Sequence, residues 1–299
     1  MDIRPHYNNS DAAVALESYM LNDDNNALNN IYKNDRKHRG FCVQKFDKPK
    51  KWAIVRNDGV AHDKPFTFHL KCAIAAKTFP PFQSCDIPNN SSRYKYLRVG
   101  GTFIGFDIPE FQTAVKNMAI LHGVLDKAFP EHQLQPWSRC DAFGWTSFDA
   151  STRIFTPAHD ADRNAYAGMP AEWDPTGKLR AADRGKLWFL RDNCVSFGEF
   201  ERDSDDKLST GVRDLSPTAF RIGDIVDVQF AIYAIQVGEQ NYKMFLSLQG
   251  VYLVDDSFSE DAAITEKLYP VERVLAEQAR RRQLAEEDDP EASTRMCIS

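Results

Sequence analysis

Residues 225–234 read IVDVQFAIYA, and residues 242–254 read YKMFLSLQGVYLV. In the first stretch, apolar side chains occupy every second position from Val226 to Ala234, which is the pattern of a strand with one buried face. Residues 238–241 (GEQN) predict the turn of an antiparallel hairpin between the two stretches. The side chains expected on the apolar face of the return strand are Met244, Leu246, Leu248 and Tyr252. A hairpin of this length should be central to the fold.

Shorter strand-like segments and one clear helix precede the hairpin in the sequence. The strand-like segments lie at residues 40–46, 52–56, 66–74, 94–99 and 102–107. Gly100-Gly101, between the last two, can form a hairpin turn or a bulge within one long bent strand. Residues 109–128 begin with Pro109 and place apolar side chains at three- and four-residue steps. This spacing predicts an amphipathic helix that packs against a sheet.

The order of these elements predicts a mainly β (α+β) fold. Strands on both sides of one helix fit an OB-like antiparallel β-barrel or a β-sandwich with added helices. The expected divisions are a helical extension at 1–39, a β-rich core at 40–256, and a C-terminal helix with a disordered tail at 257–299. The core could also be two sub-barrels, and its residues 156–185 read as a long loop.

Composition sets the class of protein. The 299 residues are 42% hydrophobic and 27% charged, a balance typical of a globular chain. The net charge of −6 argues against a surface that binds nucleic acid everywhere, but it permits a local basic face. The six cysteines form no C-x-x-C pair, and the first residues lack the apolar stretch of a signal peptide. We therefore expect reduced thiols, no membrane contact, and an intracellular location, nuclear or cytoplasmic.

Two short segments carry a resemblance to known proteins. Residues 220–228 read FRIGDIVDV, and this Gly-Asp entry into a strand resembles that of OB-fold single-strand-binding proteins. The same entry, together with LQGVYLVD at 248–255, is similar to uncharacterised fungal proteins found near mobile elements. The first resemblance agrees with a barrel. The second covers the last strand pair and carries no settled activity.

Two basic segments interleaved with rings indicate a ligand. Residues 33–56 hold nine Lys or Arg against two Asp, a charge of +7. Residues 93–98 (RYKYLR) repeat the mixture, and a strand there would put Tyr94, Tyr96 and Arg98 on one face. Single-strand binders combine a positive groove with rings that stack on bases. The expected phosphate contacts are Lys45, Lys48, Lys50, Lys51, Arg56, Arg93, Lys95 and Arg98, and the expected stacking rings are Phe46, Trp52, Tyr94 and Tyr96. Alternatively, the charges are solvated surface and the rings are core.

Other chemistry has less support in the sequence. His159 and Asp160 lie in an acidic loop that could bind a metal ion or transfer protons, or could simply be hydrated. His69 and Cys72 make a single pair that would point to opposite faces of a strand, so a zinc site is not expected. Phosphate-binding glycine loops and nucleophile elbows are absent from the sequence. We therefore expect no catalytic residue, metal or cofactor.

The sequence thus predicts a sequence-tolerant protein that binds single-stranded DNA or RNA and performs no catalysis. A first alternative is a protein–protein adaptor or scaffold that uses a sheet edge and the charged helix at 270–289. A second alternative is a metal-dependent enzyme that uses the loop at 157–185.

Overall fold

The computed structural model describes residues 3–21, 23–33, 40–47, 50–202, 208–238 and 241–269. The predictions for Lys48 and for the helix and tail within 270–299 lie outside the described residues. Among the helices of the described part, none is long and apolar enough to cross a membrane.

The predicted hairpin is present as β11 (Ile225–Gln236) and β12 (Tyr242–Asp255), which pair antiparallel along their whole length. Its apolar face is fully buried, because the alternating positions of both strands point into the main core. The core residues that the hairpin contributes from these positions include Val228, Phe230, Ile232, Met244, Leu246 and Leu248. The sequence pattern therefore identified both the element and its buried side.

A bulge in β12 changes which side chains are buried beyond Leu248. Phe230 pairs with Leu248, but the preceding residue of β11, Gln229, pairs with Gly250, so one residue of β12 is extra. An extra residue reverses the alternation that follows it. Val251 is therefore buried, and the prediction that Tyr252 shares the face of Leu248 is wrong.

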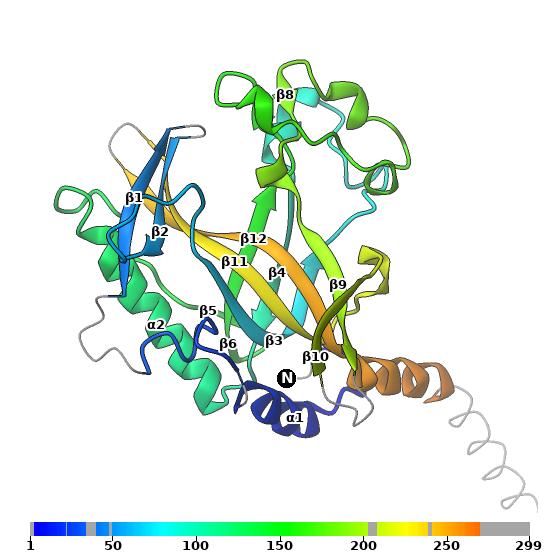
Figure 1. Cartoon of the computed structure of the whole chain (residues 1–299). Helices are drawn as coiled ribbons and strands as arrows, with labels where there is room; N and C mark the ends of the chain where they lie inside the picture. The colour runs from blue at the N-terminus through cyan, green and yellow to red at the C-terminus, as the bar shows by residue number, and fades with distance from the viewer. Residues whose placement is uncertain are drawn as a thin grey trace, which may run out of the picture.

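The remaining strands extend the hairpin on both sides into one large sheet (Figure 1). The strand order is β10-β9-β12-β11-β3-β4-β6-β5, and the hairpin of β1 and β2 joins through β2 to β11. Their bounds are β1 (Phe41–Asp47), β2 (Lys50–Arg56), β3 (Thr67–Thr78), β4 (Arg98–Ile104), β5 (Cys140–Ala142), β6 (Trp145–Arg153), β9 (Ser196–Arg202) and β10 (Leu208–Asp214). All pairings in this sheet are antiparallel except that of β9 with β12.

The sheet curls strongly, but its described strands do not form a closed barrel. The hydroxyl of Thr152 on β6 donates to the carbonyl of Leu248 on β12 at 2.7 Å, so two strands that are not neighbours in the order come together. This contact is made by a side chain, and no backbone ladder between β6 and β12 is present among the described residues. Where the sequence predicted an OB-like antiparallel barrel or a sandwich, the described strands form one open curled sheet whose order ends at β10 and β5.

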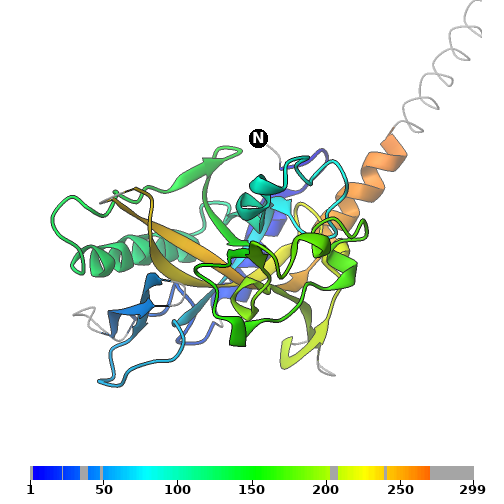
Figure 2. The ribbon, with the colours of Figure 1, turned by 90° about the horizontal axis from the view of Figure 1, so that it is seen from above.

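The predicted amphipathic helix is α2 (Pro109–Asp126), two residues shorter than expected. Proline occupies its first turn, where the missing N–H has no acceptor to lose. Its buried stripe consists of Phe111, Ala114, Val115, Asn117, Met118, Leu121 and Leu125. Figures 1 and 2 show α2 on the side of the β1–β2 hairpin, while the helix at 257–269 extends away from the opposite side.

The other elements are short and lie around the sheet. They are α1 (Asn9–Leu21), β7 (Thr156–Pro157), β8 (Leu187–Trp188) and six 3-10 turns. The turns are η1 (Ser91–Tyr96), η2 (Arg163–Ala165), η3 (Ala171–Trp173), η4 (Arg180–Ala182), η5 (Arg191–Asn193) and η6 (Pro217–Ala219). Residues 156–185, expected to be a long loop, fold into β7 and three of these turns around buried Trp173 and Leu179.

Candidate nucleic-acid interface

The first basic segment lies on the β1–β2 hairpin, and the start of β2 directs it toward a cleft. Lys50, Lys51 and Trp52 all line this cleft. Lys45 is exposed on β1 and lies 3.6 Å from Asp47, outside the cleft lining. The structure therefore separates Lys45 from the other three residues.

Phe46 and Arg56 take different positions on the same hairpin. Phe46 pairs with Lys51 across the β1–β2 ladder and packs against a small buried cluster that contains Ala53 and Tyr233. Arg56 lies at the far end of β2, where its guanidinium covers the ring of Phe66 at 4.4 Å and that of Phe41 at 5.0 Å. It also donates to the side chain of Asn26 at 2.8 Å. Arg56 thus holds the hairpin to its neighbours, away from the cleft.

The second basic segment is not the strand that its alternation predicts. Residues Ser91–Tyr96 form a 3-10 turn, which begins where Asn90 accepts a hydrogen bond from the backbone of Ser92. Asparagine favours such local caps over extended structure. Within the turn Tyr94 is buried, whereas Arg93, Lys95 and Tyr96 are exposed outside the cleft lining. The proposed shared face of Tyr94, Tyr96 and Arg98 is therefore wrong.

Arg98 is the member of the second segment that reaches the cleft, because β4 begins at this residue. Both glycines that follow lie inside β4 and do not form a hairpin turn. A Cβ at Gly100 would lie 2.7 Å from the carbonyl oxygen of Ala150 on β6, so only glycine lets the two strands approach here. The close pairing of β4 with β6 is what brings Arg98 beside Arg153.

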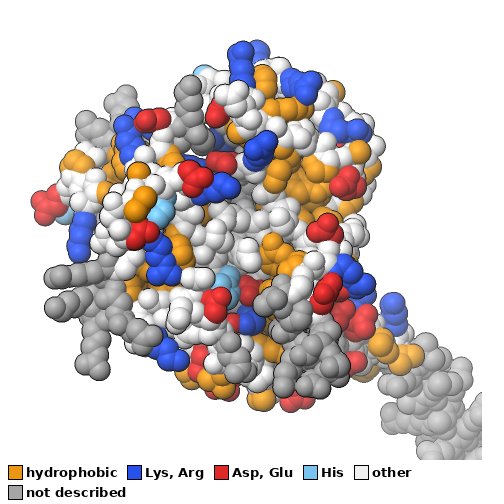
Figure 3. Space-filling model, in the orientation of Figure 1, with side chains coloured by type: hydrophobic (Ala, Val, Ile, Leu, Met, Phe, Trp, Pro, Cys, Tyr) orange, Lys and Arg blue, Asp and Glu red, His pale blue; other side chains and the backbone are white. Residues whose placement is uncertain are grey.

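Lys50, Lys51, Trp52 and Arg98 meet in one cleft of about 380 Å³, which we call the basic cleft. Strands β2, β4, β6, β11 and β12 form it together with residues near β7 and η5. Its charged residues are Lys50, Lys51, Arg98, Arg153, Asp160 and Asp192, and its rings are Trp52, Tyr233 and Phe245. Figure 3 shows a hollow at the centre of the face seen in Figure 1, with blue and red side chains in contact at its upper rim.

Two arginines lie directly opposite each other in this cleft. Arg98 on β4 pairs with Arg153 on β6, and like charges at opposed positions of a ladder repel. Neither guanidinium has an ion pair within the described part of the chain. Burial lowers the pKa of Arg153, the carboxylate of Asp160 opposes this effect, and the charge of Arg98 adds to it. Both groups stay protonated, so an anion between them would relieve their repulsion.

The rings of the cleft already lie next to cations. The Nζ of Lys51 is 4.4 Å from the centroid of Tyr233, and the guanidinium of Arg98 is 4.7 Å from that of Phe245. The Nζ of Lys50 is 5.7 Å from the centroid of Trp52, which also contacts the rings of Phe129 and Tyr242 at 5.2 and 4.9 Å. Cations above ring faces are stabilised by the ring quadrupole, which fixes the positive groups at the cleft surface.

Sequence reasoning missed several residues of the basic cleft, most notably Arg153, Tyr233 and Phe245. Tyr233 and Phe245 are cross-strand partners on the side of the hairpin that faces away from the main core. The period-two alternation that identified the buried face also places these two rings on the other face, so the signal was available. Arg153 ends β6 and is set beside Arg98 by tertiary pairing, for which the sequence has no local signal.

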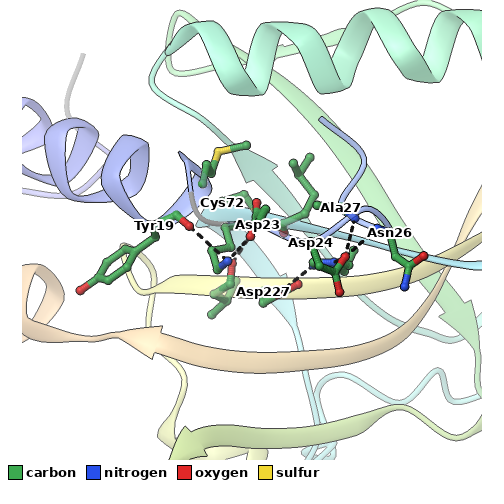
Figure 4. Close-up of polar contacts among 12 residues, drawn as sticks. Tyr19, Asp23, Asp24, Asn26, Ala27, Cys72 and Asp227 are labelled. Carbon is green, nitrogen blue, oxygen red and sulfur yellow. Dashed lines mark hydrogen bonds and ion pairs between the residues drawn. The ribbon is translucent and has the colours of Figure 1, made fainter. Parts of the chain in front are cut away.

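A second polar cluster lies on the same open face, further along β3 and β11 (Figure 4). His69 lies between two carboxylates, with Nδ1 3.0 Å from Asp227 and Nε2 3.0 Å from Asp24. Burial alone lowers the pKa of His69, but the hydrogen bonds and charges of these carboxylates raise it to about 9. Beside it, the ammonium of Lys71 pairs with Asp23 and donates to the carbonyl of Tyr19.

This cluster attaches the N-terminal segment to the sheet. Asp23 and Asp24 follow α1, and the backbone N–H of Leu28 donates to the carbonyl of His69 at 2.9 Å. Cys72, three residues after His69, is buried in the core on the other side of β3, as the alternation predicts. Among the described residues, no group of three or more His, Cys, Asp or Glu side chains is arranged to hold a metal ion.

In the acidic loop that suggested an enzyme, the histidine is not enclosed by other side chains. The side chain of His159 is 79% exposed, and the ion pair it makes is with its neighbour Asp160 at 3.5 Å. Asp160 contributes to the basic cleft instead, as one of its two carboxylates.

Comparisons with known proteins find similarity only at the level of structure. No family model matches the chain, and no curated protein matches it. The structure of gp2.5, a single-stranded DNA-binding protein of bacteriophage T7, is 14% identical with a TM-score of 0.30, over 62% of this chain and 91% of that chain.

The single-stranded DNA-binding protein of bacteriophage Enc34, truncated at its C-terminus, is 11% identical with a TM-score of 0.29, over 73% of this chain and 94% of that chain. Its complex with single-stranded DNA gives 11% identity and a TM-score of 0.28, over 73% and 96% of the two chains. TM-scores this low do not establish a shared fold, so a functional conclusion must rest on the basic cleft itself.

Proposed function

We propose that the chain binds single-stranded nucleic acid in the basic cleft, without strong sequence preference and without catalysis. The observation that carries this proposal is the convergence of four cations and three rings from five strands in one cleft, although the whole chain has a net charge of −6. Local positive charge combined with rings is the arrangement that single-strand binders use. Lys50, Lys51 and Arg98 are the predicted phosphate contacts that take part.

The chemistry of the cleft favours a flexible polyanion. Arg98 and Arg153 repel each other until an anion lies between them, and a phosphodiester is matched to guanidinium geometry. A volume of about 380 Å³ is that of a small-molecule site, which admits one nucleotide unit but not the width of a base-paired duplex. Trp52 and Phe245 provide half-buried ring surface for an unpaired base.

The proposal is tested by fluorescence anisotropy with labelled single-stranded DNA and RNA oligomers and a matched duplex, titrated from low to physiological salt. The cleft variant is Arg98→Gln with Arg153→Gln. The control variant is Arg93→Gln with Lys95→Gln, which removes the same charge from the exposed 3-10 turn outside the cleft.

Each lost phosphate contact should reduce the slope of log K against log salt by about 0.7 for a single strand. We therefore expect the slope of log K against log salt to be smaller by about 1.4 in the cleft variant, and its affinity to be at least about tenfold lower. The control variant should keep the slope of the wild type. Equal losses in both variants would show diffuse surface attraction and contradict the cleft. Absence of binding by the wild type at low salt would contradict the function itself.

A further inference from the structure

Asp192 lies at the basic cleft on a turn that is held firmly in place. It is the middle residue of η5, and its neighbour Asn193 is buried. The side chain of Asn193 donates to the carbonyl of Arg153 at 3.1 Å and accepts from the backbone N–H of Leu190 at 2.8 Å. These bonds tie the turn to the end of β6, so the fold places the backbone of Asp192 at the cleft.

The carboxylate of Asp192 forms an ion pair with Lys51 across the cleft, at 2.9 Å. The Lys51 side chain is only 12% exposed and rests over the ring of Tyr233, whose hydroxyl is 3.4 Å from Nζ. Burial raises the pKa of Tyr233, so this hydroxyl is neutral at physiological pH and supplies no counter-charge. Within the described residues, Asp192 is the carboxylate in ion-pair contact with Lys51.

We propose that Asp192 occupies the position at Lys51 that a backbone phosphate takes on binding, and thereby determines which anions enter the cleft. This inference rests on the proposed function. The Asp192 side chain is 55% exposed, so its carboxylate can leave Lys51 for water when a ligand phosphate takes its place. A nucleic-acid strand can displace the carboxylate, because its other phosphates contact Arg98 and Arg153 and compensate for the lost ion pair between Asp192 and Lys51. An isolated monoanion makes no such second contact.

The test is Asp192→Asn, which keeps the shape of the side chain and removes its charge. Single-stranded DNA should bind about threefold to tenfold more tightly to this variant at low salt. Asp160→Asn is the matched control, because Asp160 lines the same cleft but contacts His159 and not Lys51. Each of the two Asp→Asn changes is also combined with Lys51→Gln in a double variant. Thermal unfolding followed by circular dichroism checks that each variant is folded.

If the tighter binding of Asp192→Asn comes from loss of the ion pair with Lys51, it must disappear when Lys51 is also replaced. We expect the gain from Asp192→Asn to fall to the level of Asp160→Asn once Lys51 is replaced, whereas the effect of Asp160→Asn should not depend on Lys51. If the wild type binds and Asp192→Asn gives no gain, or a gain that persists without Lys51, the inference is overturned and the proposed function stands. If no folded variant binds at low salt, both are overturned.

Discussion

His69 provides the sharpest test of the electrostatics, because two carboxylates enclose one imidazole. Its side chain is 16% exposed, and Asp227, which it contacts at 3.0 Å, is 6% exposed. The charged groups that face it are Asp227, Asp24 and Asp23, with Lys71 paired to Asp23 beside it. The perturbation is His69→Gln, which keeps one hydrogen-bond donor and removes the titration.

The magnitude follows from the pKa of His69, which rises from 6.5 to about 9 in the folded protein. A group that binds its proton more tightly when folded adds stability at low pH, and this contribution disappears as the pH rises through the folded pKa. The contribution is therefore complete below pH 6.5 and lost by pH 9 to 10. At 1.36 kcal/mol per pKa unit, the loss is at most about 3.4 kcal/mol.

The assay is urea unfolding at pH 6, 7.5, 9 and 10. The free energy of unfolding of the wild type should fall across this range, and that of His69→Gln should start lower at pH 6 and fall much less. His159→Gln is the control, because its side chain is 79% exposed. If His69→Gln retained the wild-type fall between pH 6.5 and 9, the raised pKa would not be a property of His69 and the reasoning would be refuted.

Three further predictions concern the packing of the sheet, and urea unfolding at pH 7 measures each as a loss in the free energy of unfolding. Gly100→Ala should lose about 1–3 kcal/mol, because the new Cβ would lie 2.7 Å from the backbone oxygen of Ala150. An unchanged stability would mean that β4 and β6 are further apart. Thr152→Val should lose about 1–2 kcal/mol, because the carbonyl of Leu248 loses a donor at 2.7 Å. A neutral effect would show that the contact between β6 and β12 is not stabilising. Phe230→Ala should lose about 3–5 kcal/mol, because the side chain is fully buried among other rings. A loss below about 1 kcal/mol would contradict its place in the core.

The sequence could predict those parts of the fold that depend on regular repetition. Period-two alternation identified β11 and its buried face, and the three- and four-residue spacing after Pro109 identified α2. The alternation holds over nine residues and the helical spacing over fifteen, from Phe111 to Leu125, so tertiary contacts reinforce these patterns and do not override them. Their agreement with the structure reflects the burial of one continuous apolar face.

Shorter patterns failed where one local hydrogen bond or one extra residue was decisive. Six residues around Tyr94 alternate like a strand, but the cap made by Asn90 starts a 3-10 turn that buries the ring. One extra residue after Leu248 was enough to exchange Tyr252 for Val251 in the core. Neither the 3-10 turn nor the bulge changes the amino-acid composition of its segment, so counting apolar and polar positions in the sequence does not reveal it.

The candidate site was harder to predict than the fold, because its members are distant in the chain. Lys51 and Arg98 were named from local charge, but Arg153 and Asp192 enter the cleft through the pairing of β6 and the anchoring of η5. The curl that brings β6 to β12 completes the site. Long-range pairing of this kind follows from packing the whole sheet, which single-segment patterns do not encode.

The open face of the hairpin also explains how an acidic chain can present a basic site. Gln229, which pairs with His69, is four residues from Tyr233 along β11, a separation of about 13 Å at 3.3 Å per residue. Within the described residues, the carboxylates around His69 make their ion pairs with His69 and Lys71 and not with the cations of the cleft. The His69 cluster also neutralises itself in part, because the imidazole and Lys71 offset two of its three carboxylates. The cleft therefore holds four cations against two carboxylates, a local excess of positive charge in a chain whose net charge is −6.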